Sequence, residues 1–151
     1  MKISRKNWLV YLRLFMGISW FGSGLGKIIM GQAKVIEQIT FFASQNSITW
    51  YSNFLDGIIM PNSTLFTYFL TYGELLVGIS LILGALTNVG CFFGIFMNVN
   101  YALVVVGAVT FVAIPNLIMI ALQLILLLSP RSKMFSLDKK IAEKIPWFNP
   151  C

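Results

Sequence analysis

The segment from 64 to 83, TLFTYFLTYGELLVGISLIL, contains a single charged residue, Glu74, in an otherwise uncharged run. Its length matches the roughly 20 residues that an α-helix needs to cross the hydrocarbon core of a bilayer. Pro61, Asn62 and Ser63 come directly before it and form a typical helix start. We therefore expect a transmembrane helix here, with a carboxylate near its middle.

The composition of the whole chain supports a membrane location. Of 151 residues, 58% are hydrophobic and 11% are charged, and the mean hydropathy is +0.82. A soluble domain carries about 25% charged residues, because its surface faces water. The chain is short enough to form one domain, 1–151. It leaves little room for a soluble catalytic module beside the membrane-spanning part.

Three further apolar runs complete the predicted architecture. They cover residues 8–30, 89–112 and 115–129, the last opening at Pro115 and Asn116. Because the connection between the last two runs is very short, those helices are expected to be antiparallel neighbours. The sequence thus predicts an all-α integral membrane protein with a four-transmembrane-helix bundle.

The segment between the first two spans, 31–61, contains a second helical pattern. Ile48, Tyr51, Leu55 and Ile58 recur at helical spacing, with polar residues between them. This pattern predicts an interfacial amphipathic helix between the first and second spans. Two alternatives remain open: a loop helix that packs over the bundle, and a lid over a binding site.

The basic residues predict the orientation of the chain. They precede the first span and follow the last: Lys2, Arg5, Lys6, Arg131, Lys133, Lys139, Lys140 and Lys144. Basic residues next to spans favour the cytoplasmic side, so both termini are predicted to be cytoplasmic. The tail 130–151 is expected to lie along membrane lipid headgroups. A nucleic-acid partner is disfavoured, because these residues form no dense stripe.

Charged residues inside the spans are the strongest indication of function. There are three, Arg13, Lys27 and Glu74, and each is costly in hydrocarbon unless it is paired or hydrated. Lys27 lies close to the outer end of the first span and can extend to the headgroups. Glu74 is predicted to lie about 15 Å from either surface, at the helical rise per residue. It is the first candidate for a catalytic residue.

Helical spacing indicates which polar residues share a depth with Glu74. Asn98 and Tyr101 in the third span and Gln123 in the fourth are expected near the same level. Arg13 is expected about one turn nearer the cytoplasm, within reach of Glu74 as a direct partner. One interpretation is that this cluster only holds the helices together. The other is a site for a polar headgroup or a transferred proton.

Several kinds of redox site are excluded. The chain has no histidine, and its two cysteines, Cys91 and Cys151, are far apart in the sequence. Histidine-ligated haem, the usual zinc sites and dithiol chemistry are therefore not expected, and no metal ligands are evident.

The order of several short motifs resembles the DoxX/DoxD family of small four-helix membrane proteins. These motifs are LRLFMG at 12–17 with GLGK at 24–27, the stretch 50–61, GELLVG at 73–78 and MNVNY at 97–101. The DoxD branch of this family is the large subunit of a thiosulfate:quinone oxidoreductase, which works with a second subunit. The resemblance implies a prokaryotic cell membrane and a role close to quinone chemistry.

The leading hypothesis is a membrane subunit of a quinone-linked oxidoreductase, with sulfur compounds or thiols as a conceivable electron source. Glu74 and Arg13 would act in catalysis, while Asn98 and Tyr101 would bind the quinone. A second redox subunit is an expected partner, and an oligomer is compatible with the sequence. Two alternatives stay open: a non-catalytic scaffold that anchors a soluble redox partner, and a small proton-coupled carrier.

Overall fold

The computed structural model describes residues 8–106 and 110–129, and these form helices without any strand. The helices are α1 (Trp8–Met30), α2 (Gln32–Ser44), α3 (Thr49–Phe54), α4 (Ser63–Leu83), α5 (Thr87–Val105) and α6 (Thr110–Leu128). A π-helical turn, Leu55–Ile59, and a 3-10 turn, Met60–Asn62, join α3 to α4. The basic N-terminal residues and the tail 130–151 lie outside the described residues.

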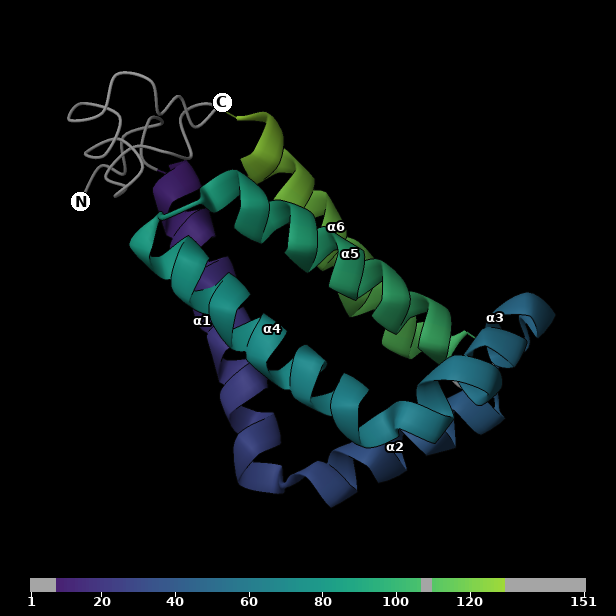
Figure 1. The fold of residues 1–151 in the computed structure, drawn as a ribbon. Helices are drawn as coiled ribbons and strands as arrows, with labels where there is room; N and C mark the ends of the chain where they lie inside the picture. Colours follow the sequence, from purple (N-terminus) through teal and green to yellow (C-terminus); the bar gives the residue numbers. More distant parts are fainter. Residues whose placement is uncertain (1–7, 107–109, 130–151) are drawn as a thin grey trace.

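Four long helices lie side by side and form the body of the molecule (Figure 1). The most extensive contacts join α1 to α4 and α5 to α6, and a smaller contact between α4 and α5 joins the two pairs. The first residues of α1, the turn after α4 and the end of α6 lie at the same end (Figure 1). The helix α2 crosses the opposite end, and α3 follows it.

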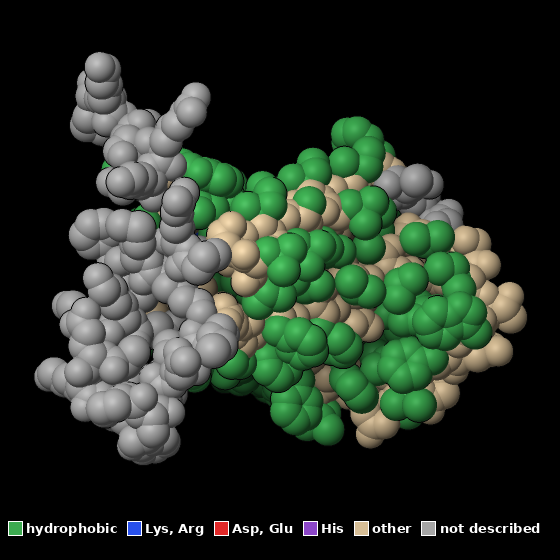
Figure 2. All heavy atoms as spheres, turned by 90° about the horizontal axis from the view of Figure 1, so that it is seen from above, with side chains coloured by type: hydrophobic (Ala, Val, Ile, Leu, Met, Phe, Trp, Pro, Cys, Tyr) green, Lys and Arg blue, Asp and Glu red, His purple; other side chains and the backbone are tan. Residues whose placement is uncertain are grey.

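The distribution of polar and apolar side chains is that of a membrane protein. Large apolar residues such as Phe15, Phe69, Leu76 and Phe111 are exposed. Figure 2 shows apolar side chains spread over one face, with no charged side chain visible on the described part in that view. The buried residues include several polar ones: Arg13, Thr67, Thr71, Glu74, Thr87, Asn98 and Gln123. A soluble fold has the reverse arrangement, so the prediction of a helical membrane protein is confirmed.

Length and hydropathy identify which helices can cross a bilayer. The continuous helix Thr49–Leu83 and α5 both qualify, and α1 with α2 qualifies as a pair bent by 108°. The apolar part of α6, Ala113–Leu128, is shorter. Among the described residues there are thus two or three candidate spans, and four crossings stay a prediction.

Glycines set the register between α1 and α4. Three opposed pairs define it: Gly17 with Ile82, Phe21 with Gly78, and Gly24 with Leu75. A Cβ on Gly78 would lie 2.5 Å from the backbone nitrogen of Phe21, so only glycine allows this approach. Since the residue numbers rise in one helix as they fall in the other, the two helices are antiparallel. This register decides which polar side chains can meet.

The chain turns sharply at Gly31, between α1 and α2. Gly31 has φ 88° and ψ 146°, a conformation that side chains with a Cβ rarely adopt. The resulting bend of 108° sends α2 across the ends of α4 and α5, with Val35 and Ala43 buried. Apolar periodicity did not predict a helix over 32–44, and only the structure shows α2.

The predicted helix around Ile48 to Ile58 is present, but its surroundings differ from the prediction. Tyr51 and Leu55 are buried, whereas Ile58 is exposed. The Tyr51 hydroxyl donates a hydrogen bond to the Asn100 carbonyl oxygen at 3.3 Å. Asn46 Nδ2 donates to the Leu103 carbonyl oxygen at 2.6 Å. These contacts favour the alternative of a helix that packs over the bundle.

The α-helix α4 begins at Ser63, directly after Pro61 and Asn62 as the sequence predicted, but the chain before it is helical as well. The chain stays helical from Thr49 to Leu83, passing Pro61 through π-helical and 3-10 turns. The side chain of Asn62 makes no capping bond and instead donates to the Ile58 carbonyl oxygen at 3.1 Å. A proline removes one N–H, and such local turns let the other backbone groups find partners.

The boundary between the last two helices also differs from the prediction. The helix α5 ends at Val105 rather than near 112, and α6 is already helical at Thr110. Pro115 therefore lies inside α6 instead of opening it. Because proline disturbs only the hydrogen bond of its own missing N–H and the turn before it, a packed membrane helix can tolerate it.

Candidate functional site: a buried ion pair beside a polar cavity

The carboxylate of Glu74 is completely buried and has four hydrogen bonds. Lys27 Nζ lies 2.6 Å from each carboxylate oxygen. The Tyr101 hydroxyl donates to Oε1 at 2.6 Å, and Ser23 Oγ donates to Oε2 at 3.1 Å. We call these four residues the Glu74 cluster.

Three helices bring the Glu74 cluster together. Ser23 and Lys27 are four residues apart on α1 and therefore share one side of that helix. The close approach of Gly24 to Leu75 places both of them at the level of Glu74 on α4. Tyr101 reaches the carboxylate from α5, and its ring centroid lies 5.4 Å from Lys27 Nζ, within the range of a cation–π contact.

The charges of Glu74 and Lys27 neutralise each other. An ammonium group has three donors, and here two face the carboxylate oxygens and one can face Ser23 Oγ at 3.2 Å. The Lys27 side chain is 21% exposed and that of Glu74 1%. An isolated charge at this depth would be costly, so the pair permits ionised groups to remain inside an apolar bundle.

A cavity of about 240 Å³ lies against the Glu74 cluster. All four cluster residues line it, and α2 covers it with Val35, Gln38, Ile39 and Phe42. The remaining walls come from Leu70, Val104, Val105 and Asn116. Pockets for drug-sized ligands begin at about 300 Å³, so this cavity suits a small ring or a few water molecules.

The prediction that Arg13 pairs with Glu74 is wrong. In the register of α1 and α4, Gly24 faces Leu75, whereas Arg13 precedes Gly17, which faces Ile82. Arg13 and Lys27 are separated by about 21 Å along α1, at 1.5 Å per residue. Arg13 is buried near the other end of the bundle, and Lys27 takes the position beside Glu74.

A signal in the sequence could have corrected this prediction. Gly17 and Gly24 on the first helix and Gly78 on the second mark the positions of closest approach. Aligning them in antiparallel order places Lys27, rather than Arg13, beside Glu74. Lys27 was instead expected to extend toward the headgroups, because it lies near the outer end of the first span. Ser23 was not among the predicted site residues, because a serine in an apolar helix forms no distinctive pattern.

The other two predicted polar residues form a separate pair. Asn98 Nδ2 donates to Gln123 Oε1 at 3.0 Å, and neither residue is among those that line the cavity. Gln123 lies directly over Gly94, where a Cβ would collide with its amide. Gln123 Nε2 has no hydrogen-bond partner among the described residues. Of the predicted site residues, the structure thus brings Glu74 and Tyr101 together and leaves Arg13 and Asn98 elsewhere.

Fold and site together define a helical membrane protein with a charged cluster enclosed between its helices. A comparison with protein-family models matches the DoxX family over residues 8–112. The chain belongs to the DoxX family. The comparisons with curated proteins and with solved structures found no match.

Proposed function

We propose that the protein is a membrane subunit of a quinone-linked oxidoreductase and that the cavity beside the Glu74 cluster binds the quinone headgroup. The observation that carries this proposal is an ion pair and a phenol lining a cavity inside an otherwise apolar bundle. Membership of the DoxX family supports it. A more specific form of this proposal is that the electrons come from a sulfur compound, as in the DoxD branch.

The residues around the cavity have the chemistry that a quinone head requires. A quinone ring is flat and apolar on its faces, with carbonyl oxygens that accept hydrogen bonds at its edge. Phe42, Val35 and Val104 supply apolar walls, and the ammonium group of Lys27 and the hydroxyl of Tyr101 supply donors. Both donors now serve Glu74, so a bound carbonyl oxygen would compete with the carboxylate for them.

Within this proposal, the residues of the site donate protons to the quinone and accept protons from their surroundings. A quinone bound there would accept electrons from a partner subunit, and each electron pair requires two protons. Tyr101 and Lys27 would each place a proton at a carbonyl oxygen. Glu74 would hold both donors in position and exchange protons with them. Lys27, which is partly exposed, would connect the cluster to water.

Measuring the quinone that co-purifies with the protein tests the proposal. The wild type, extracted with native lipids, is compared with Tyr101→Phe, which lacks one donor to the cavity. Since a hydrogen bond between neutral groups contributes about 0.5–1.5 kcal/mol, quinone content should fall by about two- to tenfold. The matched control is Tyr68→Phe, because Tyr68 is exposed on α4 and does not line the cavity. Equal quinone content in all three proteins, or none in the wild type, would count against binding.

A second candidate function, the non-catalytic scaffold, has an observation of its own in its favour. The polar hydrogens of the Glu74 cluster are shared among its four members, as expected for a group that only joins three helices. The scaffold hypothesis predicts a redox partner that co-purifies with the protein while no quinone does. The same purification therefore separates the two functions.

A further inference from the structure

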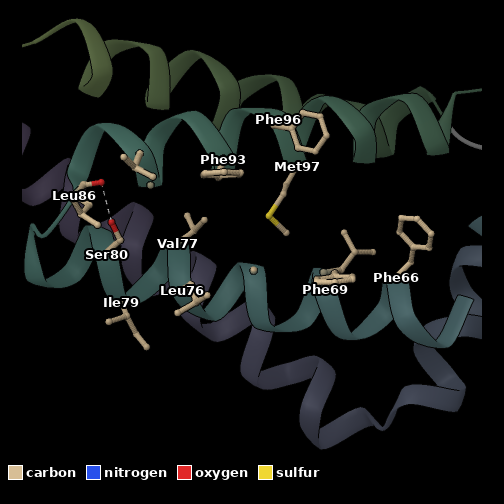
Figure 3. Close-up of a pocket in the computed structure, with 14 residues that line it drawn as sticks. Phe66, Phe69, Leu76, Val77, Ile79, Ser80, Leu86, Phe93, Phe96 and Met97 are labelled. Carbon is tan, nitrogen blue, oxygen red and sulfur yellow. Dashed lines mark hydrogen bonds between the residues drawn. The ribbon is translucent and has the colours of Figure 1, made fainter. Parts of the chain in front are cut away.

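A long apolar groove runs between α4 and α5 (Figure 3). Its volume is about 740 Å³, and its lining contains no charged residue. Phe66, Phe69, Phe93 and Phe96 are among its walls, and Met97 lies between the two helices (Figure 3). The groove extends from Phe66 to Ser80 on α4, about 21 Å at the rise of an α-helix.

The groove adjoins the polar cavity of the Glu74 cluster. Leu70 lines both spaces. Gly73 lines the groove and its neighbour Glu74 lines the cavity. The two spaces are therefore neighbours along one turn of α4, with Leu70 in the wall of both.

From this juxtaposition we infer that the groove holds the isoprenoid chain of the quinone whose headgroup occupies the cavity. The inference rests on the proposed function. A quinone needs a small site with polar groups next to a long apolar one, and the two spaces that share Leu70 have this arrangement. The polar side chain in the groove, Ser80, donates to the Ala85 carbonyl oxygen at 2.6 Å, so it does not require a polar ligand.

Gly73 offers a way to obstruct the groove without disturbing the cavity. A Cβ at Gly73 would lie 3.5 Å from the Met97 side chain, which is an ordinary contact. In Gly73→Leu the longer side chain would extend into the groove, and leucine favours the helix more than glycine does. The matched control is Gly22→Leu, because a Cβ on Gly22 of α1 would meet nothing within 4 Å.

The test compares two quinones with the same head ring, one with a long isoprenoid chain and one with a methyl group in its place. Binding is measured in lipid nanodiscs, with empty nanodiscs subtracted. At equal concentrations of the two quinones in the lipid, the wild type and Gly22→Leu should prefer the long-chain quinone severalfold, because close van der Waals packing of its chain in the groove exceeds its contacts with lipid tails. Gly73→Leu should lose that preference and keep its affinity for the short quinone. Tyr101→Phe should weaken the binding of both.

The other possible results distinguish failure of the groove inference from failure of the proposed function. If the wild type binds both quinones equally, or if Gly73→Leu keeps the chain preference, the groove inference is wrong while the proposed function stands. If neither quinone binds, both proposals fail. If Gly73→Leu changes the oligomeric state measured by light scattering and leaves the chain preference intact, the groove is an interface between copies. That result also overturns the inference.

Discussion

At the scale of single residues, the partner of Glu74 is Lys27 and not the predicted Arg13, and this difference changes the chemistry of the site. A guanidinium stays protonated at any physiological pH, whereas a lysine ammonium can release a proton when its surroundings favour it. The cluster therefore consists of a carboxylate, an ammonium and a phenol. Asn98 and Gln123, which do not titrate, form their own pair.

This assignment predicts energetic coupling between Lys27 and Glu74. Lys27→Met should destabilise the bundle by about 3–5 kcal/mol, because the Glu74 carboxylate would remain buried without its counter-charge. Lys27→Met combined with Glu74→Leu should recover much of that loss. The measurement is a double-mutant cycle on thermal unfolding in mild detergent.

Arg13 supplies the control for that cycle. Arg13→Met and Glu74→Leu should have additive effects, because about 20 Å separates the two levels along α1. Strong coupling between Arg13 and Glu74, with additive effects for Lys27 and Glu74, would show that the register described here is incorrect.

At the scale of helices, α2 gives the site its enclosure. Its side chains cover the cavity, and its direction depends on the bend of 108° after α1. The lid alternative concerned the helix around Ile48 to Ile58, which does not line the cavity; α2, which was not predicted, lies over it instead. The contacts of Asn46 with Leu103 hold the far end of this segment against α5.

The bend predicts a specific cost for changing Gly31. Gly31→Ala should destabilise the protein by about 1 kcal/mol or more, because a side chain at φ 88° is strained. Gly57→Ala is the control, since Gly57 lies in a helical turn with open space around its Cα. Thermal unfolding of both variants checks this. A loss for Gly57→Ala that equals or exceeds the loss for Gly31→Ala would contradict the explanation.

At the scale of the whole molecule, the bundle has two different ends. The start of α1, the turn after α4 and the end of α6 share one end, and α2 and α3 lie at the other (Figure 1). The positive-inside rule assigns the first of these ends to the cytoplasm. This orientation remains a prediction, as does a prokaryotic cell membrane as the location.

Thiol labelling in intact cells tests the orientation. A membrane-impermeant reagent should not label Cys151 from outside, because the C-terminal tail is predicted to be cytoplasmic. Lys34→Cys, made together with Cys151→Ser, should be labelled, since Lys34 is exposed on α2 at the opposite end. Cys91 is buried, but it is replaced in both proteins to remove background. Labelling of Cys151 and not of the residue 34 cysteine would reverse the orientation.

The sequence alone was sufficient for the class of protein and for the presence of a carboxylate, Glu74, inside an apolar helix. Low charge and long apolar runs allow few structures other than membrane helices, because an unpaired backbone group is too costly in lipid. The first helix covers the residues expected of the first span, Trp8–Met30. A lone carboxylate among apolar residues can be recognised from the sequence, since the free-energy cost of placing it in hydrocarbon does not depend on tertiary detail.

Only the tertiary structure decided which residues surround Glu74. Helical periodicity gives the side of a helix on which a residue lies, but not its height relative to a neighbouring helix. That height is set by the fit of Gly17, Gly24 and Gly78 against the facing backbone, and a difference of a few turns replaced Arg13 with Lys27. The cover over the cavity likewise depends on a backbone angle at Gly31, which apolar periodicity does not encode.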